Sequence, residues 1–279
     1  MTPDPERIAR TFSRCRAEGR PVLVTYVMGG DPDLATSKAI ALACVDGGAD
    51  LVELGVPFSD PIADGPTIQA AAGRALARGV TTHGVLEVAA HLRARSDLPI
   101  ALMGYLNPML AHGLERFAAD CGAAGVDALI VPDLLPEESG ELAPALAAAG
   151  VRSVFLLAPT SGPERIAAAA RAATGFLYFV SVTGVTGTRG ADAEAIRPAV
   201  SAIRAATSLP VVIGFGVSTP EQARAIGRLA DGVVVGSAIV RRVAAPGDRA
   251  ARVARVRSFV RSLRRALGPL ARALASPPG

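Results

Sequence analysis

The sequence predicts an α/β fold, a (β/α)8 TIM barrel with an extra N-terminal helix. Eight short, continuous apolar runs recur along the chain, and a helical segment follows each one. Continuous apolar runs are typical of parallel strands buried on both faces, and their alternation with helices indicates a barrel. The length of 279 residues suits this fold. We therefore expect residues 1–279 to form a single domain, with 276–279 as a disordered tail.

The expected elements follow in chain order. A helix over 4–18, with apolar residues at helical spacing, is expected to cover the bottom of the barrel. The expected strands span 22–28, a run that begins at 51, 100–103, 128–131, 153–157, 176–180, 211–213 and 232–235. The expected helices span 34–47, 67–78, 83–96, 115–124, 137–149, 163–173, 193–206 and 220–229, and a last helix spans 248–267.

A doubly wound open sheet is the alternative fold. Such a sheet does not readily use eight equivalent strand–helix units, which here repeat roughly every 25 residues. The turn after the first strand also lacks the glycine fingerprint of a dinucleotide-binding site. Both observations favour the closed barrel.

Composition and charge exclude several classes of function. No apolar run reaches the ~20 residues needed to span a membrane, and the charged residues 1–19 lack a signal-peptide core. We therefore expect a cytoplasmic protein. The net charge of +4 is spread along the chain and there is no tryptophan, so single-stranded nucleic acid finds no stacking platform. The three cysteines lack metal-binding spacing. The apolar stripe of 248–267, flanked by arginines, is typical of a helix packed on a core rather than on a membrane or DNA.

Two acids mark a candidate active site. Glu53 lies inside an apolar strand, where an acid is costly unless it is paired or functional. Asp64 lies in the loop that follows, just before a helix that begins near Pro66. A barrel carries its chemistry at the carboxyl ends of its strands and in the loops after them. We interpret the two acids as a catalytic pair. The alternative is structural, with Glu53 paired to a buried arginine and Asp64 bound to loop amides.

Glycines after the last two strands predict a phosphate site. Gly214 and Gly216 follow the seventh strand, and Gly236 and Ser237 open a short helix after the eighth. Glycine lets backbone N–H groups approach an anion closely, and a helix N-terminus favours negative charge. The loop 181–190, rich in glycine and small polar residues, predicts a lid over the site. A plain flexible loop is the alternative.

The stretch from Glu53 through Gln69 resembles the signature segment of the tryptophan synthase alpha chain family, and the resemblance extends over about residues 7–267. It implies a carbon–carbon lyase that cleaves indole-3-glycerol phosphate into indole and glyceraldehyde 3-phosphate. Its implied catalytic residues are Glu53 and Asp64. Its implied substrate-binding residues are Tyr178, Thr186, Gly187, Gly216, Gly236 and Ser237, with Thr186 contacting Asp64 and Tyr105 nearby. Its implied partner interface comprises Pro57, Asp60, Pro61, Asn107 and Pro108.

The inventory of side chains agrees with acid–base cleavage. Lys38 is the only lysine, and it falls inside a predicted helix, whereas a Schiff-base aldolase needs a lysine in the site. The three histidines also fall on helices, so we expect no metal site. Proton transfer by carboxylates remains. We expect Asp64 to act at the indole N–H and Glu53 at indole C3 and the glycerol hydroxyl, with the pKa of Glu53 raised by its apolar strand.

The resemblance also implies partners. It implies no cofactor in this chain and a beta subunit that carries pyridoxal phosphate and receives the indole, in an α2β2 heterotetramer. The ligand is then a small molecule, with no nucleic acid and no membrane. The alternatives are a stand-alone lyase, another phosphate-binding barrel such as an isomerase, and a non-catalytic binding or regulatory subunit. The chain departs from the family at Met28, where we expect a smaller or polar residue, so packing at the indole pocket is expected to differ.

Overall fold

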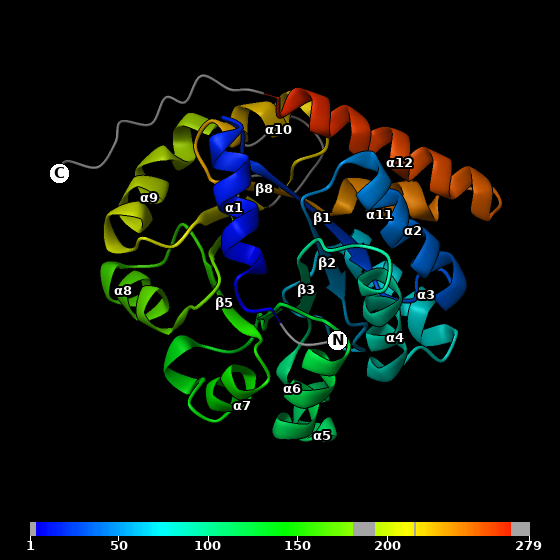
Figure 1. Ribbon diagram of the computed structural model, residues 1–279, viewed down its shortest axis with the longest axis horizontal. Coiled ribbons are helices and arrows are strands. Elements are labelled where there is room, and N and C mark those ends of the chain that lie inside the picture. The colour runs from blue at the N-terminus through cyan, green and yellow to red at the C-terminus, as the bar shows by residue number, and fades with distance from the viewer. Residues whose placement is uncertain (1–3, 181–192, 215, 269–279) are drawn as a thin grey trace.

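The computed structural model describes residues 4–180, 193–214 and 216–268. Within these ranges, parallel strands pair in sequence order, and β8 pairs with β1 to close the barrel that the sequence predicts. Figure 1 shows the strands at the centre with helices around them. The strands are β1 (Val22–Met28), β2 (Leu51–Gly55), β3 (Ile100–Met103), β4 (Ala128–Ile130), β5 (Arg152–Leu157), β6 (Leu177–Val180), β7 (Val211–Gly214) and β8 (Gly232–Val235).

Helices follow the strands and pack around the outside of the barrel (Figure 1). They are α1 (Arg7–Ala17), α2 (Leu34–Gly47), α3 (Pro66–Ala77), α4 (Thr82–Arg93), α5 (Leu106–His112), α6 (Leu114–Ala123), the 3-10 helix η1 (Pro136–Glu138), α7 (Leu142–Ala148), α8 (Pro163–Ala172), α9 (Ala193–Ala206), α10 (Pro220–Gly227), α11 (Ser237–Ala244) and α12 (Arg249–Ala266). Helix α12 lies along α2, where Gly47 packs against Val260. The apolar stripe of the last helix therefore packs on the barrel's helical layer.

The strands form because nearly every residue in them is apolar and buried. All of β1, β2, β7 and β8 is buried. Parallel strands covered on both faces need such sequences. Glu53 is the only acid inside the described strands, so the one carboxyl group buried within these strands lies in β2.

Buried aspartates hold the N-terminal end of the barrel. One aspartate directly precedes each of β2, β4 and β8. Each of them accepts a hydrogen bond from a backbone N–H of the neighbouring strand: Asp50 from Leu23, Asp127 from Ile100 and Asp231 from Val211. Arginines of α1 form ion pairs with all three, namely Arg14 with Asp50, Arg7 with Asp127 and Arg16 with Asp231. Helix α1 therefore covers this end, as predicted, and leaves the carboxyl ends of the strands for the site.

Three helical segments differ from the prediction. The expected helix over 137–149 is divided into η1 and α7, because Gly140 interrupts it. Helix α5, which contains Asn107 and Pro108, was not predicted. Proline is tolerated in the first turn of a helix, where its missing N–H would have no partner. The helix that opens at Ser237 also continues to Ala244, beyond the short segment expected.

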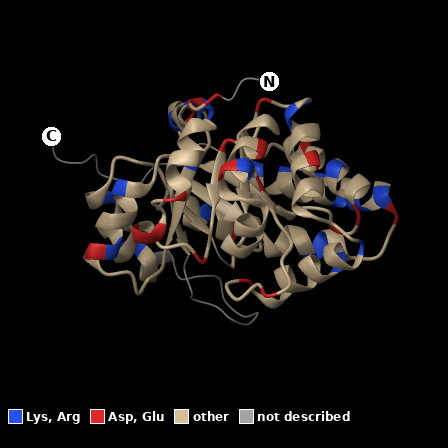
Figure 2. Cartoon of the chain, turned by 90° about the horizontal axis from the view of Figure 1, so that it is seen from below, with Lys and Arg blue, Asp and Glu red and all other residues tan. Residues whose placement is uncertain are grey.

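Charged residues are interspersed over the outer helices, whereas the central strands are mostly uncharged, as Figure 2 shows. Within the described ranges, no helix combines the length and apolar character needed to cross a membrane.

Candidate active site

Glu53 is buried without a partner. It is the third residue of β2 and is 1% exposed. Neither of its carboxylate oxygens has a hydrogen-bond partner among the described residues, so the structural alternative of a buried arginine partner is not supported. Burial, and secondarily the charge of Asp64, raise the pKa of Glu53 to about 8. A buried acid left without a partner requires an explanation other than stability.

Asp64 lies in the loop between β2 and α3 and is half-buried. Burial raises its pKa to about 6, against a hydrogen bond from the Tyr105 hydroxyl, which lowers it. The same hydroxyl accepts a hydrogen bond from the Ala63 N–H at 3.0 Å, and the Tyr105 ring packs on Phe58 with 5.3 Å between ring centroids. Tyr105, the N-cap residue of α5 after β3, therefore fixes the loop that carries Asp64.

The two acids differ in charge near neutral pH. With a pKa of about 6, Asp64 is mostly ionised at pH 7, whereas Glu53, with a pKa of about 8, is mostly protonated. Paired groups whose environments separate their pKa values can act as base and acid at the same pH. The site can therefore accept a proton or stabilise a cation at one carboxyl group and donate a proton from the other.

All three tyrosines of the chain surround this pair. Burial, followed by the charges of both acids, raises the pKa of Tyr26 in β1 and of Tyr178 in β6. Glycines make room for both rings. A Cβ on Gly55 would lie 2.1 Å from the Tyr26 hydroxyl oxygen, and one on Gly214 would lie 2.4 Å from that of Tyr178. The structure thus brings Tyr178 together with the two acids, as the resemblance implies.

Tyr26 is a site residue that the sequence analysis missed. It lies in a strand with no exposed position, and a tyrosine there resembles an ordinary core residue. Its Cα is the registered partner of the Glu53 Cα across β1 and β2. The register of two neighbouring strands was the signal that could have identified it, but register depends on how the barrel closes.

The glycine-rich end of the site lies after β7 and β8. Gly216 is exposed and has a φ of +73°, a conformation that glycine adopts without strain. Gly236 is the N-cap of α11, Ser237 is its first residue, and no side chain caps this helix N-terminus. Uncapped backbone N–H groups at a helix N-terminus suit an anion. Gly236 also packs on Tyr26, so this end adjoins the acid pair.

Several predicted residues lie at the border of the site or outside the residues that the structure describes. Thr186, Gly187 and the rest of the predicted lid lie outside the described residues. The predicted interface residues border the site on the loop after β2 and on α5, where Asp60 and Asn107 are exposed, Pro61 and Pro108 are half-buried, and Pro57 is buried. Met28 is 4% exposed and ends β1, opposite Gly55.

The lysine and the histidines lie on helices, as predicted. Lys38, in α2, forms an ion pair with Glu87 of α4 at 3.2 Å. His83 and His91 also belong to α4, and His112 at the end of α5 contacts Asp120 at 2.7 Å. Amine chemistry by Lys38 at the strand ends is therefore excluded by its position.

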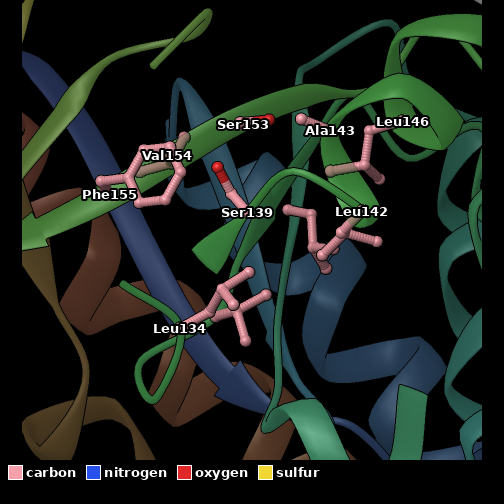
Figure 3. A pocket seen from close by; sticks show the side chains of 10 residues that line it. Leu134, Ser139, Leu142, Ala143, Leu146, Ser153, Val154 and Phe155 are labelled. Atoms are coloured by element: carbon pink, nitrogen blue, oxygen red, sulfur yellow. The ribbon is translucent and has the colours of Figure 1, made fainter. Parts of the chain in front are cut away.

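A separate apolar pocket lies between α7 and the outer face of β4 and β5 (Figure 3). Leu134, Leu142, Leu146 and Phe155 line it, and the only polar side chains there belong to Ser139 and Ser153. It contains no acid and none of the predicted site residues. Its lining therefore gives it no part in the proton chemistry.

Comparison with known proteins agrees with this geometry. The family model described as "Tryptophan synthase alpha chain" matches residues 12–267. The chain belongs to the tryptophan synthase alpha chain family. The alpha chain of Citrifermentans bemidjiense is 54% identical over 84% of this chain and 88% of the relative, and that of Geobacter sulfurreducens is 51% identical over 94% and 99%.

Solved structures of the tryptophan synthase alpha chain family share the fold. A tryptophan synthase structure from Mycobacterium tuberculosis superposes with a TM-score of 0.87 at 37% identity, covering 94% of this chain and 98% of that one. The alpha subunit from Legionella pneumophila gives 0.86 at 33% identity, covering 96% and 98%. The chain is accordingly a carbon–carbon lyase of tryptophan biosynthesis, which cleaves indole-3-glycerol phosphate to indole and glyceraldehyde 3-phosphate.

Proposed function

We propose that Glu53 and Asp64 are the catalytic pair of this cleavage. The observation that carries the proposal is the buried carboxyl group of Glu53, which lacks a hydrogen-bond partner in the described chain and lies beside a second acid of lower pKa. No stabilising contact accounts for Glu53, whereas a proton donor for a bound substrate needs such an environment.

The proposed mechanism moves one proton out of Glu53 and one back. Protonated Glu53 donates to C3 of the indole ring, and the carboxylate of Asp64 accepts the hydrogen bond of the indole N–H and stabilises the positive charge that develops there. Glu53, now ionised, takes the proton of the glycerol hydroxyl next to the ring. The carbon–carbon bond breaks as that hydroxyl becomes the aldehyde of glyceraldehyde 3-phosphate, and indole leaves. Both acids return to their starting states.

The proposed substrate-binding groups lie on two sides of the acids. We propose that backbone groups of Gly187, Gly216, Gly236 and Ser237 hold the phosphate, in the position after the last two strands that barrels commonly use. The uncapped start of α11 and the positive φ of Gly216 support this. We propose that Tyr178 contacts the substrate beside the acids and that Thr186 contacts Asp64.

Substitution of the two acids tests the assignment. Glu53→Gln and Asp64→Asn should each lower indole release at least ~100-fold, since removal of a general acid or base typically has this effect, and the thermal unfolding transition should remain cooperative. Glu87→Gln, which changes an exposed glutamate of α4 in the same way, is the matched control. If either site variant released indole as fast as the control, the substituted acid would not be needed for the reaction, and the proposed pair would be wrong.

We also propose that a beta subunit binds at the mouth of the site and receives the indole. Three large apolar side chains are exposed here: Ile62 (85%), Leu110 (49%) and Leu135 (44%). Ile62 and Leu135 lie on the loops after β2 and β4, and Leu110 lies in α5, which follows β3. Hydrogen bonds from the Ala63 N–H to the Tyr105 hydroxyl and from the Leu106 N–H to Asp133 join these three segments. Exposed apolar patches rimmed by polar residues favour protein partners. The interface would include Pro57, Asp60, Pro61, Asn107 and Pro108.

Indole release alone and with a partner distinguishes this proposal from a stand-alone lyase. We propose that the beta subunit carries pyridoxal phosphate and that two copies of each chain assemble as α2β2. Weak release by the chain alone, rising sharply when the beta subunit is added, supports the proposal, and the mass of the complex in solution gives the stoichiometry. Strong release alone, unchanged by the beta subunit, would support the stand-alone enzyme.

The domain organisation and location complete the proposal. We propose that residues 1–279 form one domain, because the family match covers residues 12–267 and the barrel takes in strands from β1 to β8. We propose a cytoplasmic location, in keeping with a biosynthetic lyase. Limited proteolysis that releases a stable fragment smaller than the barrel would contradict the single domain.

A further inference from the structure

Tyr26 spans the distance between the proposed phosphate end and the acid pair. Its Cβ and the base of its ring lie against Gly236, where an added Cβ would be 3.3 Å from the Tyr26 Cβ and 3.5 Å from its Cγ. Its hydroxyl lies over Gly55, where an added Cβ would be 2.1 Å away. Gly55 is two residues after Glu53 on β2. The side chain therefore runs from the start of α11 toward the carboxyl end of β2.

The surroundings fix the Tyr26 side chain and keep its hydroxyl neutral. The residue is 6% exposed, so its ring has little freedom to leave this position. Burial, followed by the charges of Asp64 and Glu53, raises the pKa of the phenol well above its usual value. The phenol thus keeps its proton at physiological pH and can act as a hydrogen-bond donor.

The substrate carries its phosphate and its indole at opposite ends, as the site places the start of α11 and the acid pair at opposite ends of the Tyr26 side chain. A three-carbon chain joins the phosphate ester to C3 of the indole and carries two hydroxyl groups. The hydroxyl next to the ring must lose its proton during cleavage, whereas the middle hydroxyl passes unchanged into glyceraldehyde 3-phosphate. With the phosphate at Gly236 and the indole at Glu53, the three-carbon chain must pass the Tyr26 side chain. A buried donor at this level can recognise the hydroxyl that does not react.

We propose that Tyr26 is a specificity-determining residue whose hydroxyl donates a hydrogen bond to the middle hydroxyl of the substrate's glycerol chain. The proposal rests on the proposed positions of phosphate and acids. A contact with a group that does not react stabilises the bound substrate and the transition state equally, so its loss should raise KM and leave kcat nearly unchanged. One neutral hydrogen bond is worth about 0.5–1.5 kcal/mol, which corresponds to roughly a two- to tenfold change in KM.

Tyr26→Phe tests this by removing only the hydroxyl. We would compare indole-3-glycerol phosphate with an analogue in which a plain three-carbon chain joins indole to phosphate. The variant should raise KM for the substrate roughly two- to tenfold, leave kcat within about twofold, and leave the inhibition constant of the analogue unchanged. The matched control is Thr25→Val, which removes a buried hydroxyl from the adjacent residue of β1, where it donates to the Leu51 carbonyl at 3.4 Å.

The outcomes distinguish a failure of the Tyr26 proposal from a failure of the acid-pair assignment on which it rests. An equal loss of affinity for the substrate and for the analogue would show that Tyr26 acts by packing. No change in either affinity would show that the hydroxyl makes no contact with the substrate's glycerol chain. Both results would overturn the proposal. Failure of the acid-pair assignment would instead appear as full cleavage by Glu53→Gln, a result that does not depend on the Tyr26 variant.

Discussion

At the scale of residues, this site depends on one acid in an apolar environment. Glu53 could be identified from the sequence because a glutamate inside an apolar strand stands out. Its lack of a partner and the effect of Asp64 on its pKa could not, since both depend on which side chains the barrel brings together. Tyr105 adds a third contribution, because its hydroxyl fixes both the backbone and the carboxylate of the Asp64 loop.

The pKa values of the acid pair predict a bell-shaped pH dependence. As pH rises through about 6, Asp64 loses its proton and kcat/KM should rise. As pH rises beyond about 8, Glu53 loses the proton that it must donate, and kcat/KM should fall. The two groups interact, so the measured limbs belong to the pair. Initial rates of indole release across this range check the prediction, and a rate that continues to rise above about pH 9 would contradict a role for protonated Glu53.

At the scale of elements, the two ends of the barrel have different tasks. Helix α1 and the buried aspartates before β2, β4 and β8 tie the N-terminal end together through ion pairs. The carboxyl end instead carries glycines that let tyrosine side chains lie across neighbouring strands. This division follows the general rule for such barrels, in which one end supplies stability and the other chemistry.

Asp50 provides a test of the stabilising end. Its carboxylate accepts two hydrogen bonds from Arg20, at 2.6 and 2.8 Å, and one from the Leu23 N–H. Asp50→Asn should lower the free energy of unfolding by about 3 kcal/mol, because it removes the buried charge partner of Arg20 and leaves only the more exposed Glu18, at 2.6 Å. Urea denaturation at pH 7 measures the loss, with Asp46→Asn, an exposed aspartate of α2, as the control.

The effect of Asp50 should also depend on pH. Burial would raise the pKa of Asp50, but hydrogen bonds from Arg20 and the Leu23 N–H outweigh it, and the pKa lies below its usual value. A carboxyl group with a lowered pKa in the folded state stabilises the protein above its unfolded pKa of about 4, and the stabilisation is lost as pH falls through the folded value. The difference between wild type and Asp50→Asn should therefore shrink below about pH 4. A difference that stays constant would contradict the ion-pair explanation.

At the scale of the whole molecule, the loops at the carboxyl end form one continuous edge. Hydrogen bonds join the loop after β2 to the end of β3, and the start of α5 to the loop after β4. The exposed side chains of Ile62, Leu110 and Leu135 lie along this edge. A partner seated here would cover the mouth of the site, which suits the transfer of a product that must not escape to solvent.

The edge can be tested by substitution. Leu110→Ser and Leu135→Ser should each weaken the affinity for the beta subunit at least ~10-fold, or about 1.4 kcal/mol, if these side chains anchor the interface. The free energy of unfolding should change little, because both side chains are already exposed. Leu76→Ser is the control, since Leu76 is also exposed but lies in the last turn of α3. Binding measured by calorimetry that changes equally in all three variants would contradict the proposed position.

The sequence by itself determined the order of the eight strands and the position of most of the helices. The bounds of β1, β3, β8, α2 and α9 agree with the predicted ranges, because apolar runs and helical spacing are local properties of the chain. It also identified both acids and the glycines after β7 and β8, whose residue types are unusual for their positions. The roles of these residues remain proposals, as do those of Thr186 and Gly187.

Only the tertiary structure decided which side chains meet. Tyr26, Tyr105 and Tyr178 come from three strands or strand ends far apart in the sequence, and they converge on the acids because barrel closure and strand register set which residues face inward at one level. A single-residue change of register would turn Tyr26 away from Glu53. Register is fixed by long-range packing rather than by local pattern, and for this reason the sequence indicated the two acids but not the tyrosine that lies beside them.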